Sequence, residues 1–80
     1  MLETAESRIV LDPQILGGKP CVRGTRISVE FILELISSGA TTIDVVRAYP
    51  QLTAEDVAAA AGFAANVLRV TSLTELEVVR

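Results

Sequence analysis

The sequence contains no histidine, and this absence removes several kinds of active site. Histidine is the commonest general base in proteins and a frequent zinc ligand. A serine-histidine-aspartate triad and a histidine-based zinc site are therefore excluded. The single cysteine, Cys21, cannot form an internal disulfide and has no histidine to activate it. We expect it to be a small buried thiol rather than a nucleophile.

Other catalytic patterns are also missing. The GGK sequence lacks the preceding glycine and the following Ser or Thr of a phosphate-binding P-loop. The pair Glu30 and Glu34 and the pair Glu55 and Asp56 fall on predicted helix surfaces, where solvation and the helix dipole account for them. The sequence therefore predicts no enzymatic activity, no metal site and no cofactor.

Long apolar runs are absent. No stretch approaches the roughly 18 residues that a membrane helix needs, because Glu30 and Glu34 interrupt the best candidate. No charged start followed by an apolar run resembles a secretion signal. We expect a cytoplasmic protein that does not enter a membrane.

Aromatic residues are scarce, with two phenylalanines, one tyrosine and no tryptophan in 80 residues. Half of the residues are nevertheless hydrophobic, so we expect a core of leucine, isoleucine, valine and alanine. A chain of this length buries only about 60 to 65% of its unfolded surface, which suits one small domain. We expect part of the aliphatic surface to be buried against a partner.

Basic residues are outnumbered, seven against ten acids, and the net charge is -3. This balance argues against a purely electrostatic nucleic-acid binder. The charges are unevenly distributed, since Arg8 to Arg26 holds four basic residues and one acid, whereas the chain from Ile27 onward holds three and seven. The stretch GGKPCVRGTRISV alone contains Lys19, Arg23 and Arg26. An acidic protein therefore carries one local basic cluster.

Two short β-branched runs in the first third of the chain predict a two-stranded hairpin. The runs are RIVLDP and CVR, joined by QILGGK. Gly17 and Gly18 in the connection are free to take positive φ, and Pro20 suits the start or the edge of a strand. Residues 1–7 are polar and unpatterned, and we expect them to form a loose, flexible tail.

The first predicted helix spans about residues 29–38. Ser28 is suited to cap its start, and Gly39 is placed to end it. Its apolar residues cover more than the single stripe that one packing face requires. We expect one side to face the other helices and the other side, through Phe31 and Leu35, to contact a second subunit.

Two further helices are predicted from a repeated cap, a threonine followed three residues later by an aspartate. Thr41 and Asp44 open a helix of about two turns, which a proline ends. Thr53 and Asp56 open the longest helix, which continues to about Leu68. We expect one face of this helix to pack in the core: Val57, Ala60, Ala61, Ala64 and Leu68.

The second and third predicted helices have the lengths of a helix-turn-helix. Reading base edges requires Arg, Lys, Asn or Gln, and the acids Glu55 and Asp56 would meet phosphates with the wrong charge. The standard DNA-reading face is therefore not expected, since the outward residues early in the third helix are Ala54, Glu55, Ala58 and Ala59.

The fold class predicted from these elements is mainly α with a small β-hairpin. An N-terminal two-stranded hairpin is followed by a three-helix, helix-turn-helix-like bundle, and together they form one domain over residues 8–70. Residues 71–80 form a C-terminal tail that fits either a further helical turn or a strand, and the sequence does not decide between the two.

Two motifs form a paired signature, GKPCVRGTRISV followed by YPQLTAEDV. Over about residues 8–65 the chain resembles the small bacterial family called domain of unknown function four-three-three, many of whose members are described as VapB-type antitoxins. The chain departs from the family pattern mainly at Cys21 and Ser28, where aliphatic and proline residues are expected. The resemblance implies a homeodomain-like trihelical fold after a β-hairpin, often dimeric, and a partner toxin with a PIN-like nuclease fold.

The resemblance also suggests a role for the basic residues, because PIN-type active sites gather carboxylates around magnesium. An arginine from an antitoxin can pair with such carboxylates through two hydrogen bonds and exclude the metal. A bracing role stays open for Arg23 and Arg26, since either can pair with Asp12 or with a backbone carbonyl. The candidate residues for binding a partner or nucleic acid are Lys19, Arg23, Arg26, Arg69 and Arg80.

The leading hypothesis is a non-enzymatic antitoxin, a homodimer that neutralises a cognate PIN-like toxin by direct contact. The alternative is a transcriptional regulator or autorepressor that binds operator DNA through the paired basic hairpins of a dimer. A third hypothesis is a purely structural dimerisation module. A steep loss of DNA affinity with rising salt would favour the regulator.

Overall fold

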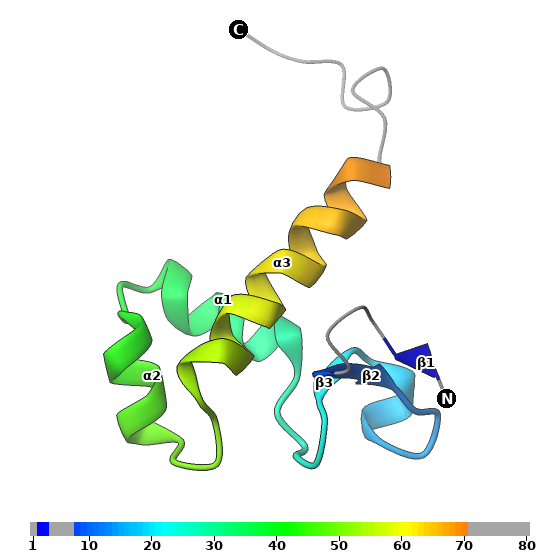
Figure 1. Ribbon diagram of the computed structural model, residues 1–80, viewed down its shortest axis with the longest axis horizontal. Coiled ribbons are helices and arrows are strands. Elements are labelled where there is room, and N and C mark those ends of the chain that lie inside the picture. Colours follow the sequence, from blue (N-terminus) through cyan, green and yellow to red (C-terminus); the bar gives the residue numbers. More distant parts are fainter. Residues whose placement is uncertain (1, 4–7, 71–80) are drawn as a thin grey trace, which may run out of the picture.

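The computed structural model describes residues 2–3 and 8–70, with three short strands followed by three helices (Figure 1). This order confirms the predicted fold class, a β-hairpin followed by a three-helix bundle. The elements are β1 (Leu2–Glu3), β2 (Ile9–Leu11), the 3-10 helix η1 (Leu16–Gly18), β3 (Cys21–Val22), α1 (Val29–Ser37), α2 (Thr42–Ala48) and α3 (Ala54–Val70).

The predicted hairpin consists of β2 and β3, which pair antiparallel. Ile9 lies opposite Val22, and Val10 lies opposite Cys21. All four of these side chains are buried. The hairpin is therefore part of the hydrophobic interior rather than an appendage to the helices.

Strand β1 falls within residues 1–7, the segment that was expected to form a loose tail. It pairs antiparallel with β2 and gives the sheet the order β1-β2-β3. A strand of two residues has no alternating pattern long enough to be recognised in a sequence. Residues 1 and 4–7 lie outside the described part of the chain.

The connection between β2 and β3 turns through η1, which the sequence did not predict. Gly17 and Gly18 have φ of 67° and 90°, as expected. Asp12 stabilises the start of the turn, because its Oδ1 accepts a hydrogen bond from the backbone N–H of Gln14 at 2.9 Å.

Helix α1 begins at the predicted cap. The hydroxyl of Ser28 accepts a hydrogen bond from the backbone N–H of Phe31 at 2.9 Å. The helix ends at Ser37, and Gly39 follows with φ of 109°, a region that side chains rarely adopt. Both predicted ends of this helix are confirmed to within one residue.

Both predicted capping boxes are also present. Thr41 and Asp44 exchange hydrogen bonds at the start of α2, and Thr53 and Asp56 exchange them at the start of α3. Helix α3 continues slightly beyond the expected end at Leu68.

The core lies between the sheet and the three helices and receives residues from each of them. Helix α3 contributes fewer residues than expected: Val57 and Ala60 are buried, Ala64 is half-buried, and Ala61 and Leu68 are exposed. The reason is visible in Figure 1, where the C-terminal half of α3 extends beyond α1 and α2. The buried residues of the whole core, from the sheet, the loops and the three helices, are Ile9, Val22, Ile27, Val29, Ile32, Val45, Leu52, Val57 and Ala60.

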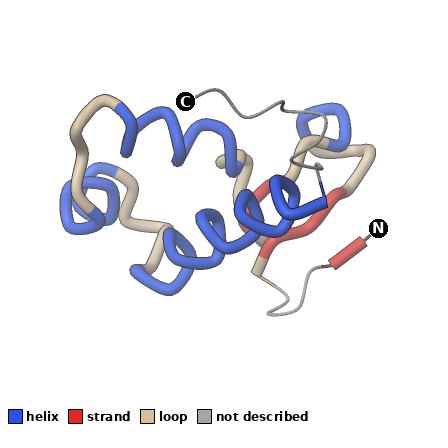
Figure 2. The backbone as a smooth tube through the Cα atoms, turned by 90° about the horizontal axis from the view of Figure 1, so that it is seen from above, coloured by secondary structure: helices blue, strands red, loops and turns tan. Residues whose placement is uncertain are grey.

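Figure 2 shows the same arrangement from above, with the sheet at one end of the molecule and α2 toward the other. Within the described ranges, none of the helices has the length and apolar character needed to span a membrane.

Candidate interaction site

The basic turn, defined here as residues 23–26, joins β3 to α1 and is held by a dense set of hydrogen bonds. The hydroxyl of Thr25 donates to the carbonyl of Val22 at 2.8 Å and accepts from the N–H of Ile27 at 3.0 Å. The N–H of Val22 donates to the carbonyl of Ile27 at 2.9 Å. Gly24 supplies the positive φ, 80°, that the turn requires. The basic turn is thus the ordered tip of a second small hairpin.

Arg23 and Arg26 stand at the two ends of this turn, and both side chains are exposed. The backbone N–H of Arg23 donates to the carbonyl of Arg8 at 2.7 Å, which ties the turn to the start of β2. Two guanidinium groups are therefore displayed from a backbone that neighbouring strands hold in place.

Cys21 lies in β3, close to the basic turn in the sequence, and is 1% exposed. Its Sγ donates to the carbonyl of Lys19 at 3.2 Å. Burial raises the pKa of the Cys21 thiol, and the nearby charges of Arg26 and Lys19 offset part of that increase. The expected buried thiol is confirmed, and both cations lie close enough to act on the same group.

Lys19 is exposed, as expected, and its Nζ lies 3.3 Å from Oε1 of Glu30. The two side chains are 62% and 64% exposed. An ion pair this open to solvent contributes little to stability. It does neutralise part of the positive charge near the basic turn.

The ion pair between Arg8 and Asp56 was not predicted. Nη1 of Arg8 lies 3.0 Å from Oδ1 of Asp56, and Asp56 is only 7% exposed. Asp56 was expected on a solvated helix surface, and the structure corrects this, because the carboxylate turns inward to Arg8. The two residues are 48 positions apart, so no spacing rule joins them.

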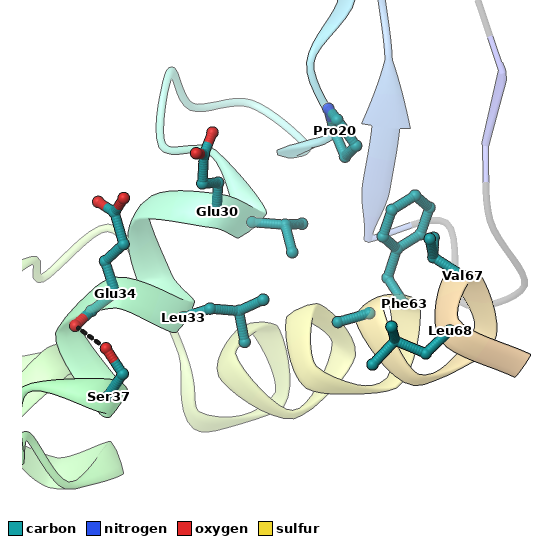
Figure 3. A pocket seen from close by; sticks show the side chains of 10 residues that line it. Pro20, Glu30, Leu33, Glu34, Ser37, Phe63, Val67 and Leu68 are labelled. Atoms are coloured by element: carbon teal, nitrogen blue, oxygen red, sulfur yellow. Dashed lines mark hydrogen bonds between the residues drawn. The ribbon is translucent and has the colours of Figure 1, made fainter. Parts of the chain in front are cut away.

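An apolar groove of about 510 Å³ lies between α1 and α3. In Figure 3, Leu33 points toward α3, whereas Glu30 and Glu34 stand on the α1 rim and point away from the floor. The hydroxyl of Ser37 donates to the carbonyl of Glu34 at 3.0 Å on the same rim. The apolar lining consists of Pro20, Val29, Leu33, Phe63, Ala64, Val67 and Leu68.

The residues expected at a dimer interface, Phe31 and Leu35, pack against the chain's own core. The ring of Phe31 meets Tyr49 edge to face, with 5.4 Å between the ring centres and 88° between the planes. These contacts account for two of the surplus apolar residues of α1 within one chain. A subunit contact through Phe31 and Leu35 stays a prediction.

Two other candidate residues lie near the C-terminus. Arg69 is exposed in the last turn of α3 and donates a hydrogen bond to the side chain of Asn66. Arg80 lies outside the described residues.

At the start of α3, three of the four residues that were expected to face outward do so. Ala54, Glu55 and Ala58 are exposed there. Ala59, expected to face outward, is half-buried and packs against the core. In the part of the chain that the structure describes, no three His, Cys, Asp or Glu side chains are grouped so as to hold a metal ion.

Comparison with known proteins identifies similar chains but no activity. The family profile described as "Protein of unknown function (DUF433)" matches residues 9–64. The crystal structure of a DUF433 member protein from Anabaena variabilis ATCC 29413 is 36% identical, with a TM-score of 0.67, and the match covers 70% of this chain and 55% of that chain.

A second similar protein is the uncharacterized protein y4eO of Sinorhizobium fredii (strain NBRC 101917 / NGR234). It is 38% identical over 69 residues, which make up 85% of this chain and 31% of y4eO. The chain therefore spans less than a third of y4eO and about half of the Anabaena chain.

Proposed function

This chain belongs to the DUF433 family, and we propose that it is an antitoxin, a binding protein that neutralises a PIN-like ribonuclease toxin by direct contact. The observation that carries the proposal is the basic turn. Arg23 and Arg26 are exposed on an ordered turn of a protein whose net charge is -3. Such a local concentration of positive charge suits an acidic pocket on a partner.

The chemistry of guanidinium groups supports this assignment. Arginine pairs with carboxylates through two parallel hydrogen bonds, and it keeps its charge at any physiological pH. A nuclease site that gathers carboxylates around magnesium offers such partners. A guanidinium placed among those carboxylates would occupy the position of the metal. Because the turn is already ordered, less conformational entropy is lost on binding.

The other basic residues near the hairpin are less suited to this role. Arg8 lies outside the basic turn, where its guanidinium contacts the buried carboxylate of Asp56, and Lys19 carries an ammonium group, which cannot form the two parallel hydrogen bonds of a guanidinium. We assign contact with the toxin to Arg23 and Arg26 because both are arginines exposed on the ordered turn.

The alternative proposal is a regulator that binds operator DNA. It would use the same two arginines, because Ala54, Glu55 and Ala58 at the exposed start of α3 include no Arg, Lys, Asn or Gln, and the charge of Glu55 is unfavourable beside phosphates. We rank it second for that reason. The two proposals differ in what the basic turn meets, carboxylates or phosphates.

The test is capture from the native host with the full-length protein, followed by assay of the captured material. We expect a small nuclease whose magnesium-dependent RNA cleavage is suppressed by the wild type. Arg23→Ala/Arg26→Ala should inhibit at least about 30-fold less well, since charge-assisted hydrogen bonds contribute about 2 kcal/mol or more together. Arg47→Ala, which removes an exposed arginine from α2, is the control and should inhibit normally.

Two results would contradict the proposal. One is the absence of any magnesium-dependent nuclease from the material captured by folded wild-type protein. The other is a nuclease that the double variant inhibits as well as the wild type. Binding to operator DNA that weakens steeply with salt and requires Arg23 and Arg26 would support the regulator instead.

A further inference from the structure

The core-facing stripe of α3 continues past the point where the domain covers it. Val57 and Ala60 are 3% and 0% exposed, but Leu68, two to three turns later on the same stripe, is 63% exposed. Val67, beside it, is 50% exposed, and Val70 at the end of the helix is 86% exposed. Figure 1 shows this end of α3 extending away from the other helices.

The composition of this end is that of a buried helix. From Ala61 to Val70 the sequence is AGFAANVLRV, in which Asn66 and Arg69 are the only polar side chains. These two are hydrogen-bonded to each other. A helix segment that is apolar on most of its surface is normally enclosed by other chain segments. The same segment borders the groove between α1 and α3.

The groove and the exposed end of α3 form one apolar patch, which contains Leu33, Phe63, Val67, Leu68 and Val70. Leu33, Phe63 and Leu68 line the groove, and Val70 is exposed two residues after Leu68. The patch therefore offers both a hollow and exposed apolar side chains that could fill one. In a two-fold symmetric dimer, the same patch on each subunit meets itself, so it must supply both halves of every contact. A heterologous partner would require only one half.

The patch also carries charged residues of both signs, so that two copies of it can attract each other. Glu34 is exposed on the α1 rim, and Arg69 is exposed beside Leu68. If Leu68 of one copy enters the groove of the other, Arg69 is carried toward the opposite rim. Glu34 of each copy can then meet Arg69 of its partner, and the patch contains both signs of charge in one surface.

We infer that the groove between α1 and α3 binds a second copy of this chain, with the end of α3 in each copy packed into the groove of the other. The resulting homodimer buries Leu33, Phe63 and Leu68. This interface differs from the one expected through Phe31 and Leu35, which pack within a single chain. The inference does not depend on the antitoxin proposal, because it concerns the purified chain alone.

The test is sedimentation equilibrium of the full-length protein over a range of about 1 to 200 µM, where mass action reveals a reversible dimer. We expect a dimer for the wild type. Leu68→Asp should raise the dissociation constant at least about 100-fold, as loss of a central interface residue typically does. The matched control is Ile43→Asp on α2, because Ile43 is also 63% exposed and lies outside the groove. It should dimerise like the wild type.

A charge exchange gives a second measurement that does not depend on an apolar substitution. Glu34→Arg and Arg69→Glu should each weaken the dimer, since like charges then face each other across the interface. The double variant Glu34→Arg/Arg69→Glu should recover most of the lost affinity. Circular dichroism confirms that each variant is folded.

Three outcomes would overturn the inference. The first is a wild type that stays monomeric over the whole range. The second is a dimer that Leu68→Asp and Ile43→Asp weaken equally. The third is a charge exchange that fails to restore the dimer.

Discussion

Arg8 and Asp56 join the sheet to the start of α3, with 3.0 Å between Nη1 and Oδ1. The other carboxylate oxygen of Asp56, Oδ2, accepts a hydrogen bond from the N–H of Thr53 at 2.9 Å. One carboxylate therefore caps a helix and binds the side chain of the residue that immediately precedes β2. Asp56 is 7% exposed, whereas the side chain of Arg8 is 40% exposed, so the carboxylate is shielded from water and the guanidinium is partly solvated.

We predict that Arg8→Ala lowers the free energy of unfolding by about 1 to 2 kcal/mol, because it removes one hydrogen bond from a buried charge whose partner is partly exposed. Asp56→Ala should cost more, about 2 to 4 kcal/mol, since it removes the cap as well. Urea denaturation measures both values. Arg47→Ala is the control, and an effect of Arg8→Ala no larger than that of the control would contradict a stabilising ion pair.

Gly39 and Gly62 provide opposite predictions for the same substitution. Gly39→Ala should destabilise the domain by about 1 kcal/mol or more, because its φ is 109°. Gly62→Ala should stabilise it by about 0.5 to 1 kcal/mol, because the residue lies within α3 and an added Cβ meets nothing within 4 Å. Thermal denaturation of the two variants tests the pair, and the same sign for both would refute it.

The capping box of α2 should make stability depend on pH in the acid range. Hydrogen bonds from the backbone N–H and the side chain of Thr41 hold the pKa of Asp44 below its ordinary value of 3.8. A lowered pKa in the folded state means that the contribution is complete above the unfolded pKa and is lost as pH falls through the folded pKa.

Asp44→Asn should abolish this dependence. The difference in unfolding free energy between wild type and variant should stay constant above about pH 5 and shrink as the carboxylate protonates. Urea denaturation at several pH values measures it. A difference that grows as the pH falls would have the wrong sign.

Cys21 should resist thiol reagents in the native protein. Its Sγ is buried, and burial raises its pKa, so the reactive thiolate is scarce and shielded. We expect reaction with a disulfide reagent at pH 8 to be at least about 1,000-fold slower than in urea, because it requires opening of the domain. The control is Cys21→Ser/Ile43→Cys, whose exposed thiol should react at once. Equal rates for the two proteins would contradict the buried position.

The helix starts could be predicted because their contacts are local. Ser28, Thr41 and Thr53 each bond to a group three residues ahead, and residue spacing alone reveals such pairs. Gly39 was recognisable for the same reason, since a positive φ after a helix is a property of one position.

Contacts between distant residues could not be predicted in this way. Nothing in the sequence pairs Arg8 with Asp56, and the burial of Asp56 follows from that pair. The exposure of Leu68 was equally hidden, because the apolar stripe of α3 is continuous in the sequence. How much of it is covered depends on the length and placement of α1.

The candidate site was predicted in part. The density of positive charge indicated Arg23 and Arg26, and both are exposed. The apolar surplus of α1 indicated a partner, but the sequence could not show that Phe31 packs on Tyr49 while Leu33 lines a groove. The positions of α2 and α3 determine which apolar residues of α1 pack within the chain and which line the groove.

The sheet and the helices share one core, in which Ile9 and Val22 pack with Ile32 and Leu52. We therefore expect the strands and helices to exchange their backbone amide hydrogens through a common global opening. The basic turn is anchored to that cooperative unit through Val22 and Ile27. Under the proposed function, a partner would therefore meet two arginines whose backbone positions are already fixed, and selection among partners would depend on fit to that fixed backbone rather than on its rearrangement.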